Sequence, residues 1–242
     1  MALRRIFVRV GDWWHGRRRI HVLHIGKTGG TALREALGPH CRTARFAIEF
    51  HGHEVKLRDI PRHDLFMFFV RDPISRFASG FRSRQRQGRP RFFYPWSDAE
   101  RAAFREFHTP NELARALGDP DAARRAAAEA AMHAIHHVGS SYWDWFESEA
   151  YFRSRLDGLF FIGFQETLSA DFETIRSKID LPGDVTLPTD DLRAHRTPPT
   201  DDAELDEASR RILRRWYARD FEFVRLCRIV TERAGDQEPA AE

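Results

Sequence analysis

The chain has 242 residues, 42% of them hydrophobic, and a formal net charge of +3 at pH 7. This length allows one α/β domain with a sizeable core. Two cysteines are too few for a disulfide-dense framework, and the lack of any run of about twenty apolar residues excludes a membrane-spanning helix.

The first 19 residues form a basic arm in which arginines accompany Trp13 and Trp14. We expect this arm to pack on the domain with its arginines solvated; the alternative is that it rests on an anionic membrane surface. It lacks the apolar core of a secretory signal. The sequence therefore predicts a soluble cytoplasmic enzyme of bacterial type.

A glycine-rich loop follows the apolar run at residues 20–23. Its residues are Gly26, Lys27, Thr28, Gly29, Gly30 and Thr31. Closely spaced glycines let backbone N–H groups turn inward, and the positive end of the helix predicted at residues 32–37 attracts an anion. Because Lys27 adds a mobile charge, the pattern predicts a phosphate cradle between a strand and a helix.

The order of residues in this loop bears on its ligand. The usual nucleotide-triphosphate loop reads G-x-x-x-x-G-K-[ST], whereas Lys27 precedes Gly29 and Gly30. This order argues against a kinase that uses ATP and magnesium. Thr28 and Thr31 still offer the hydroxyl that a magnesium ion needs, so the kinase stays open as an alternative.

Two histidines follow the next predicted strand. Residues 42–50 alternate enough to form a strand, which brings His51 and His53 to its end. Open α/β sheets bind ligands at such ends. Residues two apart on an extended chain share a face, so we expect both imidazoles to face one cleft.

An arginine and a serine follow a third strand. The apolar run at residues 65–70 predicts a buried strand that delivers Arg71. The segment after it predicts a helix that delivers Ser79, eight residues beyond the arginine. This spacing gives the chain a second anchor for an anion.

These motifs resemble the sulfotransferases that use 3′-phosphoadenosine 5′-phosphosulfate (PAPS), and more narrowly the carbohydrate branch that includes the heparan sulfate 2-O- and 6-O-sulfotransferases. The resemblance runs from about residue 20 to about residue 226. It implies that residues 26–31 grip the 5′-phosphosulfate, while Arg71 and Ser79 grip the 3′-phosphate. It also implies a P-loop-like three-layer α/β fold with a mainly parallel central sheet flanked by helices.

The same resemblance assigns the catalytic base to the motif His51-Gly52-His53. His53 is the first candidate, since a neutral imidazole accepts a hydroxyl proton at physiological pH, and His51 would orient the acceptor or the base. Lys27 and the loop N–H groups would stabilise the departing phosphate. Arg196-Thr197 resembles the loop that closes over the donor. This chemistry requires no metal.

The remaining segments predict helices around one returning strand. A single sulfotransferase-like domain is expected over residues 20–233, with a helical insertion at about residues 97–150 that faces the acceptor. Capping boxes at Ser97 and Thr109 begin two of its helices.

Beyond the insertion, residues 159–164 predict a strand, and Ser169 is expected to cap the next helix. A long loop at residues 181–200 and a helical pair at about residues 202–233 follow. Residues 234–242 are expected to be a disordered tail.

Two other clusters carry less specific signals. His133, His136 and His137 are spaced as on one helix face and could bind a metal, but a solvated face or one turned to an anionic acceptor is the simpler interpretation. The arginine-rich run at residues 82–91 is either a solvated helix end or a site for an acidic glycan. No signature supports nucleic acid binding.

The sequence thus predicts an enzyme that transfers a sulfuryl group from PAPS, without a metal, to a hydroxyl of a carbohydrate acceptor, acidic glycans included. Two rivals remain. One is the kinase that uses ATP and magnesium, and the other is a non-catalytic module whose anion site holds a sulfated or phosphorylated partner.

Overall fold

The computed structural model describes residues 16–190 and 204–235. Contacts divide these residues into two compact units, each with its own hydrophobic core. The first unit comprises the residues up to Val70 and those from Trp145 to Asp190. The second comprises Arg71–Asp144 and the residues from Glu204 onward.

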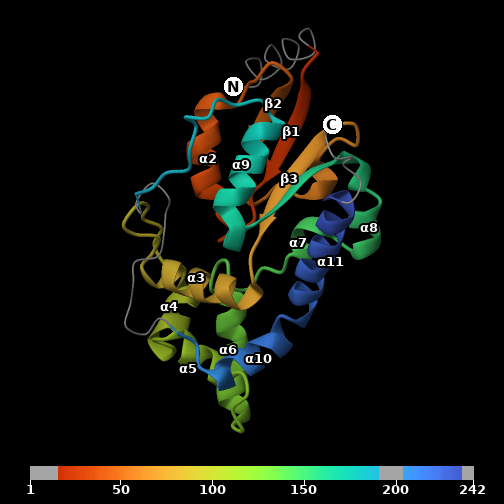
Figure 1. Ribbon diagram of the computed structural model, residues 1–242. Coiled ribbons are helices and arrows are strands. Elements are labelled where there is room, and N and C mark those ends of the chain that lie inside the picture. Colours follow the sequence, from red (N-terminus) through yellow and green to blue (C-terminus); the bar gives the residue numbers. More distant parts are fainter. Residues whose placement is uncertain (1–15, 191–203, 236–242) are drawn as a thin grey trace. The chain divides into compact units, whose positions relative to one another are not determined.

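A parallel sheet of four strands forms the centre of the first unit (Figure 1). In spatial order the strands are β2 (Phe46–Phe50), β1 (Arg18–Leu23), β3 (Leu65–Val70) and β4 (Leu159–Phe164). All three neighbouring pairs are parallel. Every residue of β3 is buried, as is typical of a central strand covered on both faces. The predicted α/β fold is confirmed.

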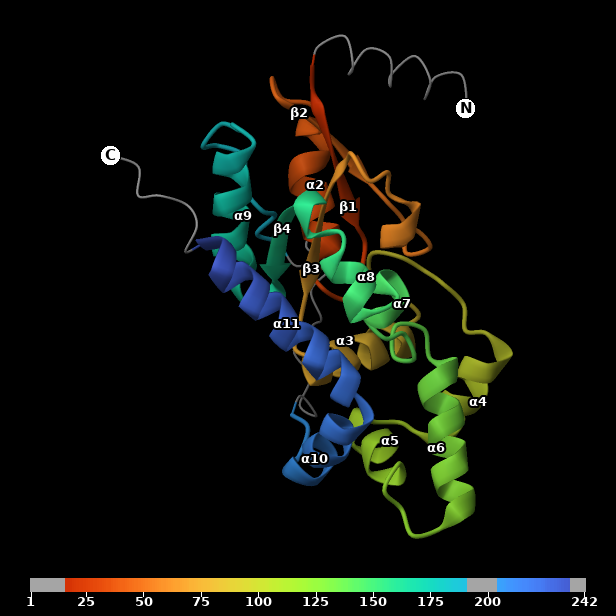
Figure 2. The ribbon, with the colours of Figure 1, turned by 90° about the vertical axis from the view of Figure 1, so that its right-hand side faces the viewer.

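Helices cover both faces of this sheet. On one face, α2 (Gly30–Leu37) and α9 (Leu168–Lys178) bury alternate residues of the strands. On the other face, Phe68 of β3 packs edge-on against Phe152 of α8 (Glu149–Arg153), with ring centroids 5.9 Å apart. Figure 2 shows α8 on the side of the sheet away from α9. Helix, sheet and helix therefore form three layers within this unit.

Four short 3₁₀ helices complete the first unit: η1 (Gly38–His40), η2 (Leu57–Asp59), η3 (Leu156–Gly158) and η4 (Gln165–Thr167). The helix η1 follows α2 directly and contains Pro39, which has no backbone N–H to continue an α-helix. The predicted end of α2 at Gly38-Pro39 is therefore confirmed.

The described part of the second unit is helical. It contains α3 (Pro73–Gln85), α4 (Asp98–Glu106), α5 (Pro110–Ala116), α6 (Ala122–Ala134), α10 (Glu207–Trp216) and α11 (Ala218–Gly235), and α7 (Trp143–Phe146) joins it to the first unit along the chain. Its core lies where α3, α4, α5, α6 and α10 meet. No helix among the described residues is long and apolar enough to cross a membrane.

Side-chain caps fix several helix starts, as the sequence predicts. Ser97 and Thr109 each accept a hydrogen bond from the backbone N–H three residues later and complete a capping box. The predicted cap at Ser169 is wrong, because α9 begins at Leu168 and no side chain caps it. The strand β2 begins at Phe46, later than predicted, since Thr43 accepts from the Phe46 N–H in a turn.

A buried ion pair ties α3 to α4. The Nε and Nη2 atoms of Arg84 donate to the two carboxylate oxygens of Glu100 at 2.6 and 2.7 Å. Burial by itself would raise the pKa of Glu100. Hydrogen bonds from Arg84, the Ser97 N–H and the His136 N–H outweigh it, so the pKa lies below its usual value. The ionised pair therefore contributes its full stability above the usual pKa of a glutamate, and this contribution is lost as the pH falls through the lowered pKa of Glu100.

We expect Glu100→Gln to lower the free energy of unfolding by about 3–5 kcal/mol at pH 7, because it leaves the Arg84 guanidinium buried without its counter-charge. Urea denaturation followed by circular dichroism measures the change. Glu106→Gln, on the exposed end of the same helix, is the matched control and should stay within about 0.5 kcal/mol of wild type. Equal effects of the two variants would contradict a special role for the pair.

Candidate active site

The glycine-rich loop leaves the sheet at a point where the chain reverses direction across it. The strand β1 pairs with β2 on one side and with β3 on the other. The chain thus moves outward from β1 to β2 and then returns past β1 to form β3. Such a switch point leaves a crevice outside the carboxyl ends of the strands, where open α/β sheets bind ligands.

The loop backbone is shaped for a tight turn. Lys27 has φ 68° and Gly29 has φ 92°, both in the left-handed region. Gly29 is the N-cap of α2, and its carbonyl accepts the Leu33 N–H at 3.2 Å. The buried Thr28 hydroxyl donates to the Ile25 carbonyl at 2.9 Å, so it braces the turn from inside. The first N–H groups of α2 remain outside the intrahelical ladder, as an anion site requires.

His24 packs against this turn. A Cβ atom on Gly30 would lie 2.6 Å from Cδ2 of His24, so only glycine fits beside the imidazole. Burial first, and then the nearby charges of His53, Arg34 and Lys27, lower the pKa of His24 to about 3. His24 is therefore neutral at pH 7 and acts as a packing surface behind the loop.

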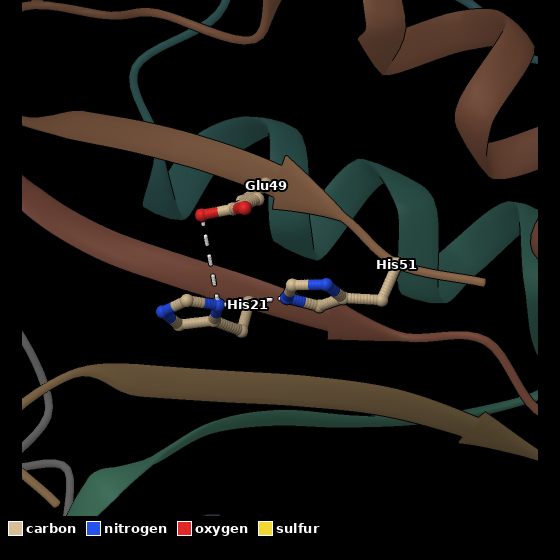
Figure 3. Close-up of side chains that lie close together, drawn as sticks. All are labelled: His21, Glu49 and His51. Carbon is tan, nitrogen blue, oxygen red and sulfur yellow. Dashed lines mark hydrogen bonds and ion pairs between the residues drawn. The ribbon is translucent and has the colours of Figure 1, made fainter. Parts of the chain in front are cut away.

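The two histidines predicted as base candidates lie beside the carboxyl end of β1. Nε2 of His51 lies 2.7 Å from Nδ1 of His21 on β1 (Figure 3). Nδ1 of His53 lies 2.8 Å from the carbonyl oxygen of His24, and the two rings are 4.1 Å apart. Each histidine thus has its own partner: His51 is tied to the middle of a strand and His53 to the start of the loop.

Arg34 of α2 fixes the backbone between these histidines and the loop. Its Nη2 donates to the His51 carbonyl at 2.6 Å, and its guanidinium lies 5.4 Å from the centre of the Phe50 ring. The His51 N–H donates to the Val22 carbonyl at 3.2 Å, which extends the β1–β2 pairing by one residue. The backbone at His51 is therefore fixed beside the carboxyl end of β1 and against α2.

One cluster of side chains could in principle bind a metal ion. One ligand atom from each of His21, Glu49 and His51 lies within 4.8 Å of the others. Two nitrogens that bind one tetrahedral zinc at about 2.0–2.1 Å lie roughly 3.3 Å apart. The nitrogens of His21 and His51 are closer, at 2.7 Å, which is a hydrogen-bond distance. The arrangement therefore fits a shared proton better than a metal.

Arg71 and Ser79 lie in the second unit: Arg71 directly precedes the N-cap of α3, and Ser79 lies within that helix. Asp72 is the N-cap and accepts the Ser75 N–H at 2.8 Å, and Pro73 occupies the first turn. Nε of Arg71 donates to the Ser75 hydroxyl at 2.9 Å. Ser79 is buried two turns into the helix. A helix start with an arginine is suited to bind a phosphate.

Tyr142 clamps the backbone of Arg71, and the sequence did not reveal it. Its hydroxyl donates to the Arg71 carbonyl at 2.7 Å and accepts the Arg71 N–H at 2.9 Å. Burial raises the pKa of Tyr142, which keeps the donor proton in place. Asp220 of α11 holds the backbone of Tyr142, since its carboxylate accepts the Tyr142 N–H at 2.6 Å. No local pattern links these three residues, which lie far apart along the chain.

Other predicted site residues have different outcomes. Arg196 and Thr197 lie outside the described residues. The prediction that His133, His136 and His137 share one helix face is wrong, because α6 ends at Ala134 and His137 has φ 70°.

The basic run at residues 82–91 is only partly a surface feature. Arg84 is buried in its ion pair with Glu100 and does not contribute to the surface. Arg89 and Arg91 instead lie over exposed aromatic rings, with guanidinium carbons 4.5 Å from the Phe93 centroid and 5.3 Å from the Phe92 centroid. The surface of this run is therefore both aromatic and cationic.

The parallel α/β sheet, the glycine-rich loop and the arginine motif are typical of proteins that bind phosphate-containing ligands. The family model described as "Sulfotransferase family" matches residues 13–224. The chain therefore belongs to the sulfotransferase family and is a PAPS-dependent transferase. No curated protein matches the chain. Membership of this family favours sulfuryl transfer over the kinase and over the non-catalytic module.

We expect Gly30→Ala to weaken binding of 3′-phosphoadenosine 5′-phosphate by about tenfold or more, because overpacking costs about 1–3 kcal/mol and the added methyl group displaces His24. Isothermal titration calorimetry measures the affinity. The control is Gly38→Ala, whose Cβ meets nothing within 4 Å. If the two variants bind alike, the close approach of His24 does not shape the loop.

Tyr142→Phe should weaken anion binding at Arg71, since it leaves the Arg71 N–H and carbonyl without the Tyr142 hydroxyl at a cost of about 1–3 kcal/mol. We expect a lower affinity for 3′-phosphoadenosine 5′-phosphate and little change for AMP, which lacks the 3′-phosphate. Tyr217→Phe removes a comparable buried hydroxyl, which donates to the Val138 carbonyl at 2.9 Å. That control should lower stability without a selective loss; the same selectivity in both variants would refute the clamp.

Proposed function

We propose that this enzyme transfers the sulfuryl group of PAPS to a hydroxyl group of a carbohydrate. The observation that carries the proposal is the position of the motif His51-Gly52-His53 beside the loop, with His53 bonded to the His24 carbonyl at 2.8 Å. This motif resembles the one that supplies the base in the 2-O-sulfotransferase branch. A base candidate thus adjoins the loop that would hold the donor.

The donor would be held by two motifs. The N–H groups of residues 26–31 and the Lys27 ammonium would bind the 5′-phosphosulfate, while Arg71 and Ser79 would bind the 3′-phosphate. Glycine at position 30 leaves room for His24 behind the loop, and left-handed residues such as Lys27 and Gly29 are typical of turns whose main-chain N–H groups bind an anion. PAPS supplies an activated sulfuryl group attached to a phosphate.

A histidine would remove the proton from the acceptor hydroxyl. The carbonyl of His24 can only accept, so Nδ1 of His53 carries a hydrogen and Nε2 is the nitrogen with a lone pair. Burial first, and then the charge of His21, lowers the pKa of His51, which keeps that imidazole neutral at pH 7. Both rings of the motif are therefore prepared as proton acceptors.

Lys27 and the loop N–H groups would stabilise the negative charge that develops on the departing phosphate. Their donors are fixed before the reaction, so little reorganisation is needed as the S–O bond breaks. The flexible ammonium of Lys27 can follow the charge as it moves to the leaving oxygen.

The aromatic and cationic surface of the second unit supports a carbohydrate acceptor. Phe92, Phe93 and Tyr94 are exposed, which is unusual for three consecutive aromatic residues. Arginine guanidinium groups cover two of these rings. Aromatic faces suit the apolar face of a sugar ring, and the arginines suit sulfate or carboxylate groups on an acidic glycan.

Calorimetry tests the donor half of the proposal, with 3′-phosphoadenosine 5′-phosphate titrated without metal and ATP titrated with magnesium. We expect micromolar binding of 3′-phosphoadenosine 5′-phosphate, weaker binding of ATP with magnesium, and a loss of about tenfold to a hundredfold with Arg71→Ala, since charge-assisted hydrogen bonds contribute about 1.5–3 kcal/mol. Arg101→Ala, an exposed arginine on α4, is the control and should bind as wild type. A preference for ATP with magnesium would overturn the donor assignment.

A further inference from the structure

A line of three hydrogen-bonded side chains crosses the sheet beneath the histidine motif. Oδ2 of Asp64 lies 3.0 Å from Nε2 of His21, and Nδ1 of His21 lies 2.7 Å from Nε2 of His51. The rings of the two histidines are nearly parallel, 7° apart. His21 is 3% exposed. Figure 3 shows His21 and His51 reaching toward each other from neighbouring segments of the sheet.

Three strands supply this line. Asp64 directly precedes β3, His21 lies within β1, and His51 directly follows β2. Because the strands are parallel, the line runs from the amino end of β3, through the middle of β1, to the carboxyl end of β2. It therefore connects a carboxylate at the amino ends of the strands with the carboxyl ends, where the loop and the histidine motif lie.

The hydrogen bonds determine which nitrogen carries each proton. An ionised carboxylate only accepts, so Nε2 of His21 is the donor to Asp64 and Nδ1 of His21 is the acceptor. Nε2 of His51 must then be the donor to His21. A neutral imidazole has one N–H, so Nδ1 of His51 carries the lone pair.

We propose that Asp64 and His21 are positioning residues that hold His51 in the Nε2–H tautomer, with its Nδ1 as the nitrogen that takes the proton from the acceptor hydroxyl. This inference rests on the proposed sulfuryl transfer. It assigns the base to His51, because the hydrogen bonds through His21 place the Asp64 carboxylate behind the His51 imidazole, where it stabilises an imidazolium.

The proton has a complete route. The acceptor O–H bond breaks as its oxygen forms the new bond to sulfur, and the proton moves to Nδ1 of His51. The bond between sulfur and the bridging oxygen breaks, and its electron pair stays on the departing phosphate. The Nε2 proton of His51 then shifts to Nδ1 of His21, so the positive charge comes to lie between His51 and the carboxylate of Asp64. The proton later returns by the same path to solvent.

Charges of both signs surround His51. Glu49 and Glu54 raise its pKa, whereas burial, His21 and Arg34 lower it, and the net pKa lies below its usual value. Arg19 lies 3.7 Å from Asp64 and 3.9 Å from Glu49 and so offsets both carboxylates. Below that pKa His51 would be protonated and unable to accept, so activity should rise with pH through it and then level off.

Histidine tautomers can be measured directly by ¹⁵N NMR of the whole protein, without donor or acceptor. We expect His21 and His51 both to carry their hydrogen on Nε2. Asp64→Asn should shift both toward Nδ1–H, because the amide can donate where the carboxylate only accepted. Glu49→Gln is the matched control: it changes a carboxylate 3.9 Å from Nδ1 of His21 that makes no hydrogen bond to the ring, and both tautomers should stay unchanged.

A second measurement connects the tautomer to the chemistry. With PAPS alone, water serves as the acceptor, and release of 3′-phosphoadenosine 5′-phosphate reports slow donor cleavage. We expect Asp64→Asn and His51→Gln each to slow this release by about a hundredfold or more, the usual contribution of a general base. Donor affinity in calorimetry should change less than about twofold, because neither residue belongs to the loop or to the arginine motif.

Two claims can fail separately: the proton relay formed by Asp64, His21 and His51, and the sulfuryl transfer that it would serve. If donor binding is normal but His51 carries its hydrogen on Nδ1, or Asp64→Asn leaves tautomers and cleavage unchanged, the relay is wrong while the sulfotransferase site stands. If zinc binds stoichiometrically, shifts Nδ1 of His21 and Nε2 of His51, and is lost in Glu49→Gln, the cluster is a metal site and the relay is overturned. If the bisphosphate does not bind at all, the donor assignment itself fails.

Discussion

The pairing of β1 with strands on both of its sides is the constraint on which the first unit depends. Because β1 lies between β2 and β3, its carboxyl end adjoins both the glycine loop and the histidine motif. Its even-numbered residues Ile20 and Val22 enter the core beneath α2 and α9. His21, between them, necessarily points to the opposite face, where it meets the chain of hydrogen bonds that ends at Asp64. A shift of one residue in register would exchange these faces and destroy both features.

Short sequence patterns predict much of this arrangement. Apolar runs of strand length mark β1, β3 and β4, and the capping boxes mark α4 and α5. The glycine loop and the arginine and serine motif are also local, since each needs only a strand end followed by a helix. These features were predictable because the residues that form them lie within about ten positions of one another along the chain.

The contacts that organise the site are not local, and the sequence does not reveal them. Tyr142 reaches Arg71 from 71 positions away, Asp220 reaches Tyr142 from 78, and Asp64 reaches His21 from 43. A lone tyrosine, aspartate or histidine carries no periodic or spacing signal, so only the fold shows that it is buried and bonded. The expectation for His133, His136 and His137 failed for a related reason: helical spacing has meaning only while the helix continues, and α6 ends first.

The few lysines of the chain differ in how well an arginine could take their place. Only Lys27, Lys56 and Lys178 occur among 39 lysine and arginine residues. Lys56 lies 4.2 Å from the centre of the Trp145 ring, a stacking role that arginine performs equally well. Lys27, by contrast, has a left-handed backbone in a tight turn. In the proposed reaction a slender, flexible ammonium there would follow charge onto the leaving oxygen, whereas the broad planar guanidinium of Arg71 would suit a phosphate that stays in place.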